Sequence, residues 1–274
     1  HSAAQLMYEK LLPREVITTK NIDHLLKTGK STQSLTSGYA ELTLDDIVDE
    51  AFATELFHQP KENRKHPKLN GLQLINREVI IKYLHQLLRI DRRSAPLRVI
   101  GHEFSVKRSL IINVNGLEKQ IETGGRIDRL DEILVDSDNA RLRVVDYKTG
   151  GKVAESLQCV DDMFDDKNIS KKSDYTMQAM LYSLIETTND SEHNPNHRAV
   201  SPALLFIQHA GSEDYNPVLS IGNEEITDVT VYEDDFFKNL IEKLEEIHNP
   251  NIPFAPTDNT NSCKYCPYKQ ICGR

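Results

Sequence analysis

The sequence has no run of about 18 apolar residues, the length that a helix needs to cross a bilayer. It also shows no signal peptide ahead of its first helical pattern. We therefore expect no membrane partner and a cytoplasmic location. A hydrophobic content of 38% and a charged content of 27% are typical of a soluble globular protein. With 274 residues, the chain can bury one sizeable core or divide into two domains.

Basic residues are fewer than acidic ones, and cysteines are few. The formal net charge of −9 argues against a protein that binds nucleic acid non-specifically over its whole surface, although it is compatible with a local basic groove. Four cysteines in a chain without secretory features argue against a disulfide framework. Cys159 stands alone, whereas Cys263, Cys266 and Cys272 crowd together near the C-terminal end.

Helical patterns dominate the first part of the chain. They cover residues 1–12, about 14–28 with a stop at Gly29, 42–58 with a cap at Thr43, and 72–91 before a loop at 92–96. The polar stretch 31–42 and the basic stretch 59–71 are expected to be loops, the second either solvated or facing DNA. Because the chain begins at His1 rather than at methionine, already inside a helical pattern, we expect a piece of a longer protein.

Strand patterns follow, at residues 96–114, 118–135 and 140–150, with Asn115-Gly116 as a hairpin turn. An irregular acidic stretch at 152–173 precedes a helix at 174–188, a buried strand at 201–208 and a last helix at 231–248; the tail shows no regular pattern. Helices, then antiparallel strands, then helix–strand–helix predict an α/β (α+β) core with an N-terminal helical arm.

The most informative stretch runs from Gly124 to Gly151. In its second strand Val144, Asp146 and Lys148 share one face, because side chains alternate along a strand. If Asp128 of the first strand faces the same space, two carboxylates and an ammonium group converge, which suits metal-assisted phosphodiester hydrolysis. A D-x-K pattern alone is far more often a surface ion pair.

Three short motifs occur in a fixed order: G-R-I-D-R at 125–129, V-D-Y-K-T-G at 145–150, and Q-x-x-x-Y at 178–182. Together they resemble the RecB-like branch of the PD-(D/E)XK nuclease superfamily. The C-x2-C-x5-C tail resembles the iron–sulfur tail of AddB-type nuclease domains and of CRISPR-associated exonucleases of that branch. This resemblance implies a restriction-endonuclease-like core, with a central mixed sheet flanked by helices.

The resemblance also implies roles for the matched residues on the strands. Asp128 and Asp146 would bind Mg²⁺ or Mn²⁺, and the backbone carbonyl of Tyr147 would be a further ligand. Lys148 would lie beside the scissile phosphate, where it would orient or activate the attacking water and offset charge in the transition state.

Four other positions match less directly. Gln178 and Tyr182 would line the site from the following helix. His1 looks like the histidine ligand that this branch carries on an upstream helix, with a purification-tag remnant as the competing interpretation. Glu103 matches an acidic position of the family, where a structural ion pair is at least as well founded as a direct role.

For the tail, the resemblance implies a structural [4Fe–4S] cluster held by Cys263, Cys266 and Cys272, with its fourth cysteine upstream of His1 in AddB-like proteins. Cys159 could substitute, but we interpret it as a packed or loop thiol. Zinc, with His248 as a ligand, is the rival metal.

The leading hypothesis is a metal-dependent DNA exonuclease domain of a helicase–nuclease repair protein, with DNA ends and a helicase domain or subunit as partners. Its expected parts are residues 1–96 (helical), 97–250 (nuclease core) and 251–274 (cysteine tail). A CRISPR-associated exonuclease is a second hypothesis, against which the long helical insert at 14–95 argues. A non-catalytic DNA-binding scaffold is a third, against which the intact D…D-x-K set argues.

Overall fold

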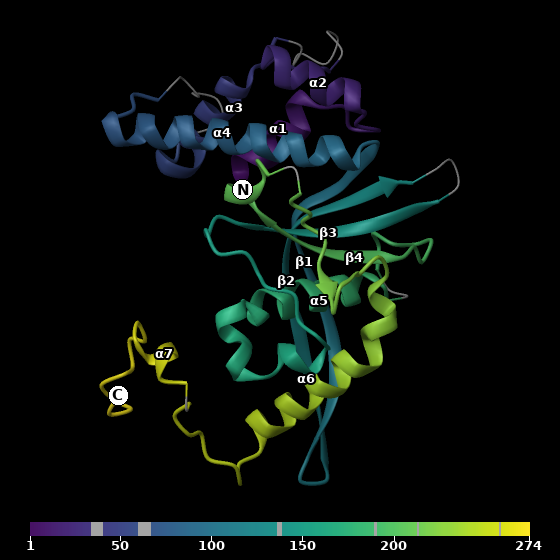
Figure 1. The fold of residues 1–274 in the computed structure, drawn as a ribbon, viewed down its shortest axis with the longest axis vertical. Helices are drawn as coiled ribbons and strands as arrows, with labels where there is room; N and C mark the ends of the chain where they lie inside the picture. The colour runs from purple at the N-terminus through teal and green to yellow at the C-terminus, as the bar shows by residue number, and fades with distance from the viewer. Residues whose placement is uncertain (34–40, 60–66, 136–138, 189–190, 213, 258) are drawn as a thin grey trace.

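The computed structural model describes residues 1–274 except 34–40, 60–66, 136–138, 189–190, 213 and 258 (Figure 1). The N-terminal helices are α1 (Ser2–Leu11), α2 (Thr19–Thr28), α3 (Leu44–Ala51), the π-helical turn η2 (Phe52–Leu56) and α4 (Gly71–Ser94). They gather at one end of the molecule, above the sheet in the view of Figure 1. No described helix is both long and apolar enough to span a bilayer.

The main sheet contains β1 (Leu97–Val114), β2 (Leu117–Leu134), β3 (Ala140–Lys148) and β4 (Val200–Phe206), hydrogen-bonded in that order. The β1–β2 and β2–β3 pairs are antiparallel, whereas β4 runs parallel to β3. Helix α5 (Ser173–Glu186) makes the crossover between β3 and β4 that a parallel pair requires. The mixed sheet with flanking helices is the predicted α/β, restriction-endonuclease-like class.

The remaining elements are small, apart from α6. They are η4 (Asp161–Met163), η5 (Asp166–Lys171), η6 (Ile207–His209), β5 (Ser220–Ile221), β6 (Glu224–Glu225), η7 (Val229–Tyr232), α6 (Glu233–His248) and α7 (Thr260–Cys263). Figure 1 shows the C-terminal tail with α7 set apart from the N-terminal helices, at the other end of the molecule.

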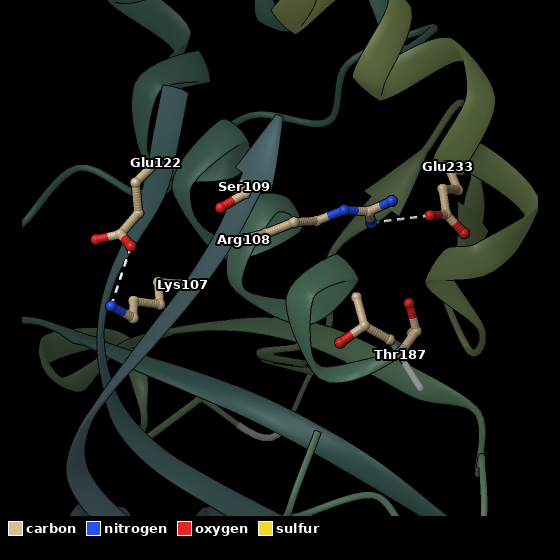
Figure 2. A pocket seen from close by; sticks show the side chains of 7 residues that line it. Lys107, Arg108, Ser109, Glu122, Thr187 and Glu233 are labelled. Carbon is tan, nitrogen blue, oxygen red and sulfur yellow. Dashed lines mark hydrogen bonds and ion pairs between the residues drawn. The ribbon is translucent and has the colours of Figure 1, made fainter. Parts of the chain in front are cut away.

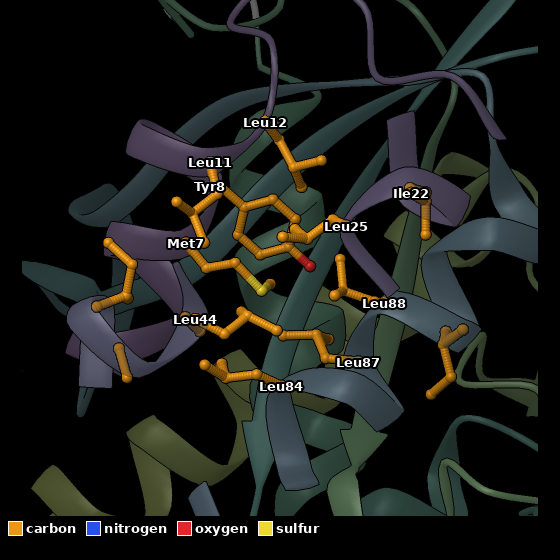
Figure 3. Close-up of a cluster of buried hydrophobic side chains, with 14 of the residues drawn as sticks. Met7, Tyr8, Leu11, Leu12, Ile22, Leu25, Leu44, Leu84, Leu87 and Leu88 are labelled. Carbon is orange, nitrogen blue, oxygen red and sulfur yellow. The ribbon is translucent and has the colours of Figure 1, made fainter. Parts of the chain in front are cut away.

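Two layers of apolar side chains enclose the sheet. The N-terminal helices form one core, with Met7, Leu11, Leu25 and Leu87 among its fully buried members (Figure 3). Helices α5 and α6 cover the other face. Strand β3 is buried on both faces, because alternate residues such as Val144 and Val145 belong to opposite cores.

Several predicted boundaries were wrong. Helix α2 starts at Thr19 instead of 14, because Thr18 and Asn21 form a capping box and Ile17 is bridged to Leu97 as extended chain. Helix α4 continues through 92–94, which were predicted as loop. The irregular 152–173 stretch contains two 3-10 helices and the tail contains α7. Much of the predicted loops at 31–42 and 59–71 lies outside the described residues.

Candidate active site

Strand β3 ends at the residues that the sequence singled out. Asp146 is buried, and its Oδ2 lies 2.6 Å from the Nζ of Lys148, so both side chains point the same way, as strand alternation predicts. Burial raises the pKa of the Asp146 carboxyl, and the Lys148 ammonium group opposes that rise. The pair lies at the C-terminal end of β3, which ends at Lys148.

Helix α5 extends this pair into a chain of hydrogen bonds. Lys148 Nζ donates to Gln178 Oε1 at 3.1 Å, and Gln178 Nε2 donates to the Tyr182 hydroxyl at 3.0 Å. Gln178 and Tyr182 meet because residues four apart share a helix face. We call Asp146, Lys148, Gln178 and Tyr182 the Lys148 chain.

Gly125, the first residue of the G-R-I-D-R motif, makes room for the end of this chain. A Cβ added at Gly125 would lie 1.9 Å from the Tyr182 hydroxyl and 2.5 Å from its ring carbon Cζ. The Tyr182 side chain is buried against the sheet and has little space to withdraw. Glycine is therefore needed at 125 for close approach rather than for its backbone angles.

Strand β2 brings Asp128 to the same end of β3. Its Oδ2 accepts a 2.7 Å hydrogen bond from the backbone N–H of Tyr147, the residue between Asp146 and Lys148. The contact of Tyr147 with Asp128 thus involves its backbone N–H, and the ligand role of its carbonyl stays a prediction.

The side chains of His1 and Glu103 lie near Asp128 and could bind a metal ion with it. His1 Nδ1 lies 3.3 Å from Asp128 Oδ1 and 3.0 Å from Glu103 Oε1. One possible metal-ligand atom from each of these three residues lies within 4.8 Å of the other two. Among the described residues, this is the only group of histidine, cysteine and acidic side chains that is close enough to share a metal ion. We call His1, Glu103 and Asp128 the donor group. Hydrogen bonding to the Asp128 carboxylate raises the pKa of His1 to about 9, with Glu103 adding to the effect and burial opposing it.

The predicted ligand set of His1, Asp128, Asp146 and the Tyr147 carbonyl shares His1 and Asp128 with the donor group. Glu103 belongs to it, whereas Asp146 is engaged with Lys148, although Asp146 lies near enough to Asp128 for the two charges to interact. Glu103 also holds the predicted ion pair, with Arg126 Nε at 2.9 Å from its Oε2. It therefore contributes to the structure and to the donor group at once.

The hairpin turn gives a second reason, besides the family resemblance, for the position of Glu103. The β1–β2 register runs without a slip from the Asn115-Gly116 turn as far as Gly101, so Glu103 falls between the pairs Phe104–Ile127 and His102–Arg129, opposite Asp128. Counting residues back from that turn gives the same answer from the sequence alone.

A buried charged network attaches the N-terminal helices to β2. Arg129 is fully buried and donates two hydrogen bonds to Asp91 of α4, at 3.0 and 2.9 Å. It also lies 2.8 Å from Asp131, while the Tyr8 hydroxyl donates to Asp91. Because Tyr8 is on α1 and Arg129 follows Asp128, this network fixes the helix of His1 relative to the strand of Asp128.

The geometry of the site and the sequence comparison agree. The sequence model of the PD-(D/E)XK nuclease superfamily matches residues 1–273. The chain belongs to this superfamily. No curated protein matches the chain.

Membership indicates a nuclease with DNA as its substrate, and PD-(D/E)XK nucleases generally use divalent metal ions. The donor group fits such an ion, because an imidazole nitrogen and two carboxylates are hard or borderline ligands suited to Mg²⁺ or Mn²⁺. The three motifs of this nuclease meet in space: G-R-I-D-R supplies Asp128, V-D-Y-K-T-G supplies Asp146 and Lys148, and the helix motif supplies Gln178.

The cysteines of this nuclease are free thiols. Cys263 and Cys266 are half-exposed, and Cys159 and Cys272 are exposed. The tail around them presents large apolar side chains to solvent, with Phe254 86%, Tyr265 87% and Ile271 84% exposed. It touches the rest of the fold through Asp166, whose carboxylate accepts from Thr257 at 3.0 Å. A short segment without a core of its own is the kind that a bound metal can order.

A polar cavity lies elsewhere on the protein and shares no residue with the donor group or the Lys148 chain (Figure 2). Its two basic residues are both paired with acids: Lys107 with Glu122 at 3.0 Å, and Arg108 with Glu233 at 2.9 Å. With its charges balanced in this way, the cavity offers a phosphate group no net attraction.

Proposed function

We propose that the chain is a metal-dependent DNA exonuclease domain of the RecB/AddB-like type, and part of a helicase–nuclease protein for double-strand-break repair. The single observation that supports it most is the adjacency of the donor group to the Lys148 chain. Possible ligands for a divalent cation lie there next to an ammonium group that is held in place by an ion pair.

The donor group would hold Mg²⁺ or Mn²⁺, and Asp146 and the Tyr147 carbonyl would complete the predicted ligand set. A bound divalent ion supplies Lewis acidity, which withdraws charge from the phosphate and eases deprotonation of a water molecule. The Tyr147 N–H bond to Asp128 keeps one carboxylate oxygen turned inward and leaves the other near His1.

Lys148 would supply the second half of the chemistry. Its ammonium group, held between Asp146 and Gln178, lies beside the donor group and can stabilise the negative charge that grows on the phosphate in the transition state. Its preorganisation matters because a group that is already in place needs no rearrangement when the charge develops.

The first prediction concerns cleavage. With Mg²⁺ or Mn²⁺ the protein should degrade linear DNA, and Asp146→Asn and Lys148→Met should each lower kcat by about a thousandfold, since each removes a charge from the reacting centre. Lys152→Met is the matched control: Lys152 is exposed, bound to Ser170 and Glu155, and should be dispensable. Full activity in both site variants would overturn the assignment.

The tail is the basis of a second part of the proposal. We propose that Cys263, Cys266 and Cys272 hold a structural [4Fe–4S] cluster with a fourth ligand elsewhere, and that residues 251–274 form a tail distinct from the helical part (1–96) and the core (97–250). The exposed apolar residues of the tail support this, because a cluster would order them. The full-length protein purified without oxygen should be brown and contain iron; a colourless protein rich in zinc would contradict the cluster.

A further inference from the structure

Tyr175 of α5 lies against two lysine side chains. The Nζ of Lys148 is 4.3 Å from the centre of the Tyr175 ring, and the Nζ of Lys172 is 4.8 Å from it. Both distances are short enough for a cation–π interaction. Tyr175 precedes Gln178 by three residues, so the two side chains share a face of α5. The ring therefore adjoins the Lys148 chain and brings a second ammonium group close to it.

Packing on the sheet holds the Tyr175 ring in place. Its centroid lies 6.4 Å from that of Phe206, the last residue of β4, which is 1% exposed. Tyr175 packs there on an apolar cluster that also contains Ala179 and Leu204. Because both α5 and β4 position the ring, the two ammonium groups share a surface that is set by the fold.

The two lysines differ in their other contacts. The ammonium group of Lys148 lies 2.6 Å from Asp146 Oδ2 and donates to Gln178 Oε1. The ammonium group of Lys172 forms no ion pair with any residue that the structure describes. Lys172 is half-buried, so water screens its charge less than that of a fully exposed lysine. Its charge is therefore available to an anion, and the anionic group of a DNA substrate is its phosphate.

The backbone of Lys172 is in an unusual conformation. Its φ of 65° and ψ of 37° place it in the left-handed region, between η5 and α5. This region is unfavourable for a residue with a Cβ atom, whereas glycine adopts it freely. Strained residues of this kind cluster at functional sites, which agrees with a role for the Lys172 side chain.

We propose that Lys172 binds the phosphate next to the scissile one and is a specificity-determining residue of the nuclease reaction. The inference rests on the proposed function, because it places the scissile phosphate at Lys148. Since both ammonium groups contact one ring, a strand with its scissile phosphate at Lys148 has its neighbouring phosphate within reach of Lys172. Lys148 would stabilise the reacting phosphate, and Lys172 would fix the position of the strand.

The direct test replaces one phosphate of a short oligonucleotide by an uncharged methylphosphonate. Two such substrates carry it on the 5′ or the 3′ side of one mapped cleavage position, and kcat/KM at that position is compared with the all-phosphate substrate. One of the two should lower the wild-type kcat/KM roughly tenfold, the size of a hydrogen bond to a charged group. Lys172→Met should cause a similar loss on the all-phosphate substrate, with no further loss on that methylphosphonate, because both changes remove the same contact.

Three further variants complete the test. Lys172→Arg keeps the charge and should respond as wild type does. Lys171→Met is the matched control, because it removes the same charge from the next residue, whose ammonium group interacts with Asp162; it should keep the full response. Should Lys172→Met fail to fold, Lys172→Gly, which suits the left-handed backbone, takes its place. Additive losses from the lysine variant and both methylphosphonates, or no loss from either one in wild type, would overturn the inference.

Salt dependence gives a readout without cleavage. With the metal chelated, the slope of log binding constant against log salt concentration should become shallower by about 1 in Lys172→Met, as expected for one lost phosphate contact. An unchanged slope would contradict the contact.

The all-phosphate substrate separates this inference from the proposed function. If wild type cleaves it with Mg²⁺ or Mn²⁺ while the losses are additive, the nuclease assignment stands and the role of Lys172 falls. If wild type does not cleave it at all, the proposed function itself is contradicted.

Discussion

The Lys148 chain and the donor group, which lie side by side, are built in different ways. Two of the contacts in the Lys148 chain are local, between residues two apart on β3 and four apart on α5, and the third joins Lys148 to Gln178 across 30 positions. The donor group instead joins the first residue of the chain to two strands, with His1 and Glu103 separated by 102 positions. Short-range geometry therefore sets most of the Lys148 chain, whereas packing of the N-terminal helices on the sheet sets the donor group.

The comparison implies that the donor group is the more fragile half. The buried network around Arg129 holds α1 and α4 on β2. The hydrogen bonds of the Lys148 chain do not involve any residue of that network. A variant that loosens this network should damage metal binding, while a variant on the α5 side should damage turnover.

The largest expected effect comes from Arg129→Met. The substitution removes the two hydrogen bonds that Arg129 donates to Asp91 and the ion pair that it forms with Asp131. The free energy of unfolding should therefore fall by about 3–5 kcal/mol. Chemical denaturation measures this, and the affinity of the folded fraction for Mn²⁺ should fall as well. Arg92→Met is the control: its pair with Asp23 is exposed and should leave the midpoint unchanged. Equal midpoints for both variants would contradict the role given to the network.

A smaller, more local effect is expected from Gly125→Ala. The new methyl group would displace the Tyr182 hydroxyl, break its 3.0 Å bond with Gln178 and loosen Lys148, lowering kcat roughly ten- to a hundredfold with Mn²⁺ affinity unchanged. Gly71→Ala is the control, since nothing lies within 4 Å of a Cβ there.

A double variant sharpens this result. Because Tyr182→Ala removes the clashing atoms, adding Gly125→Ala to it should cost little more than Tyr182→Ala alone. Additive losses would show that Gly125 acts through some other contact.

Local patterns predicted the fold well. The Asn115-Gly116 turn, the apolar run of β4 and the helical spacing of α5 all follow from short-range rules, and each element is present. Errors arose where a distant partner decides the outcome, as at Ile17, which pairs with Leu97 and delays the start of α2.

The candidate site shows the same division. The common direction of Asp146 and Lys148 follows from strand alternation, and the contact of Gln178 with Tyr182 from helix periodicity. The position of Glu103 opposite Asp128 follows from the hairpin register that the Asn115-Gly116 turn sets. The spacing of residues does not show that Glu103 joins His1, because the two are 102 positions apart.

Calorimetric titration with Mn²⁺ tests the central claim most directly, because it reports on the donor group independently of cleavage. Wild type should bind the ion at a single site, and Asp128→Asn should abolish that binding. Glu122→Gln, which changes an exposed acid of the same strand that pairs with Lys107, should leave it intact. Unchanged Mn²⁺ binding in Asp128→Asn would contradict the account.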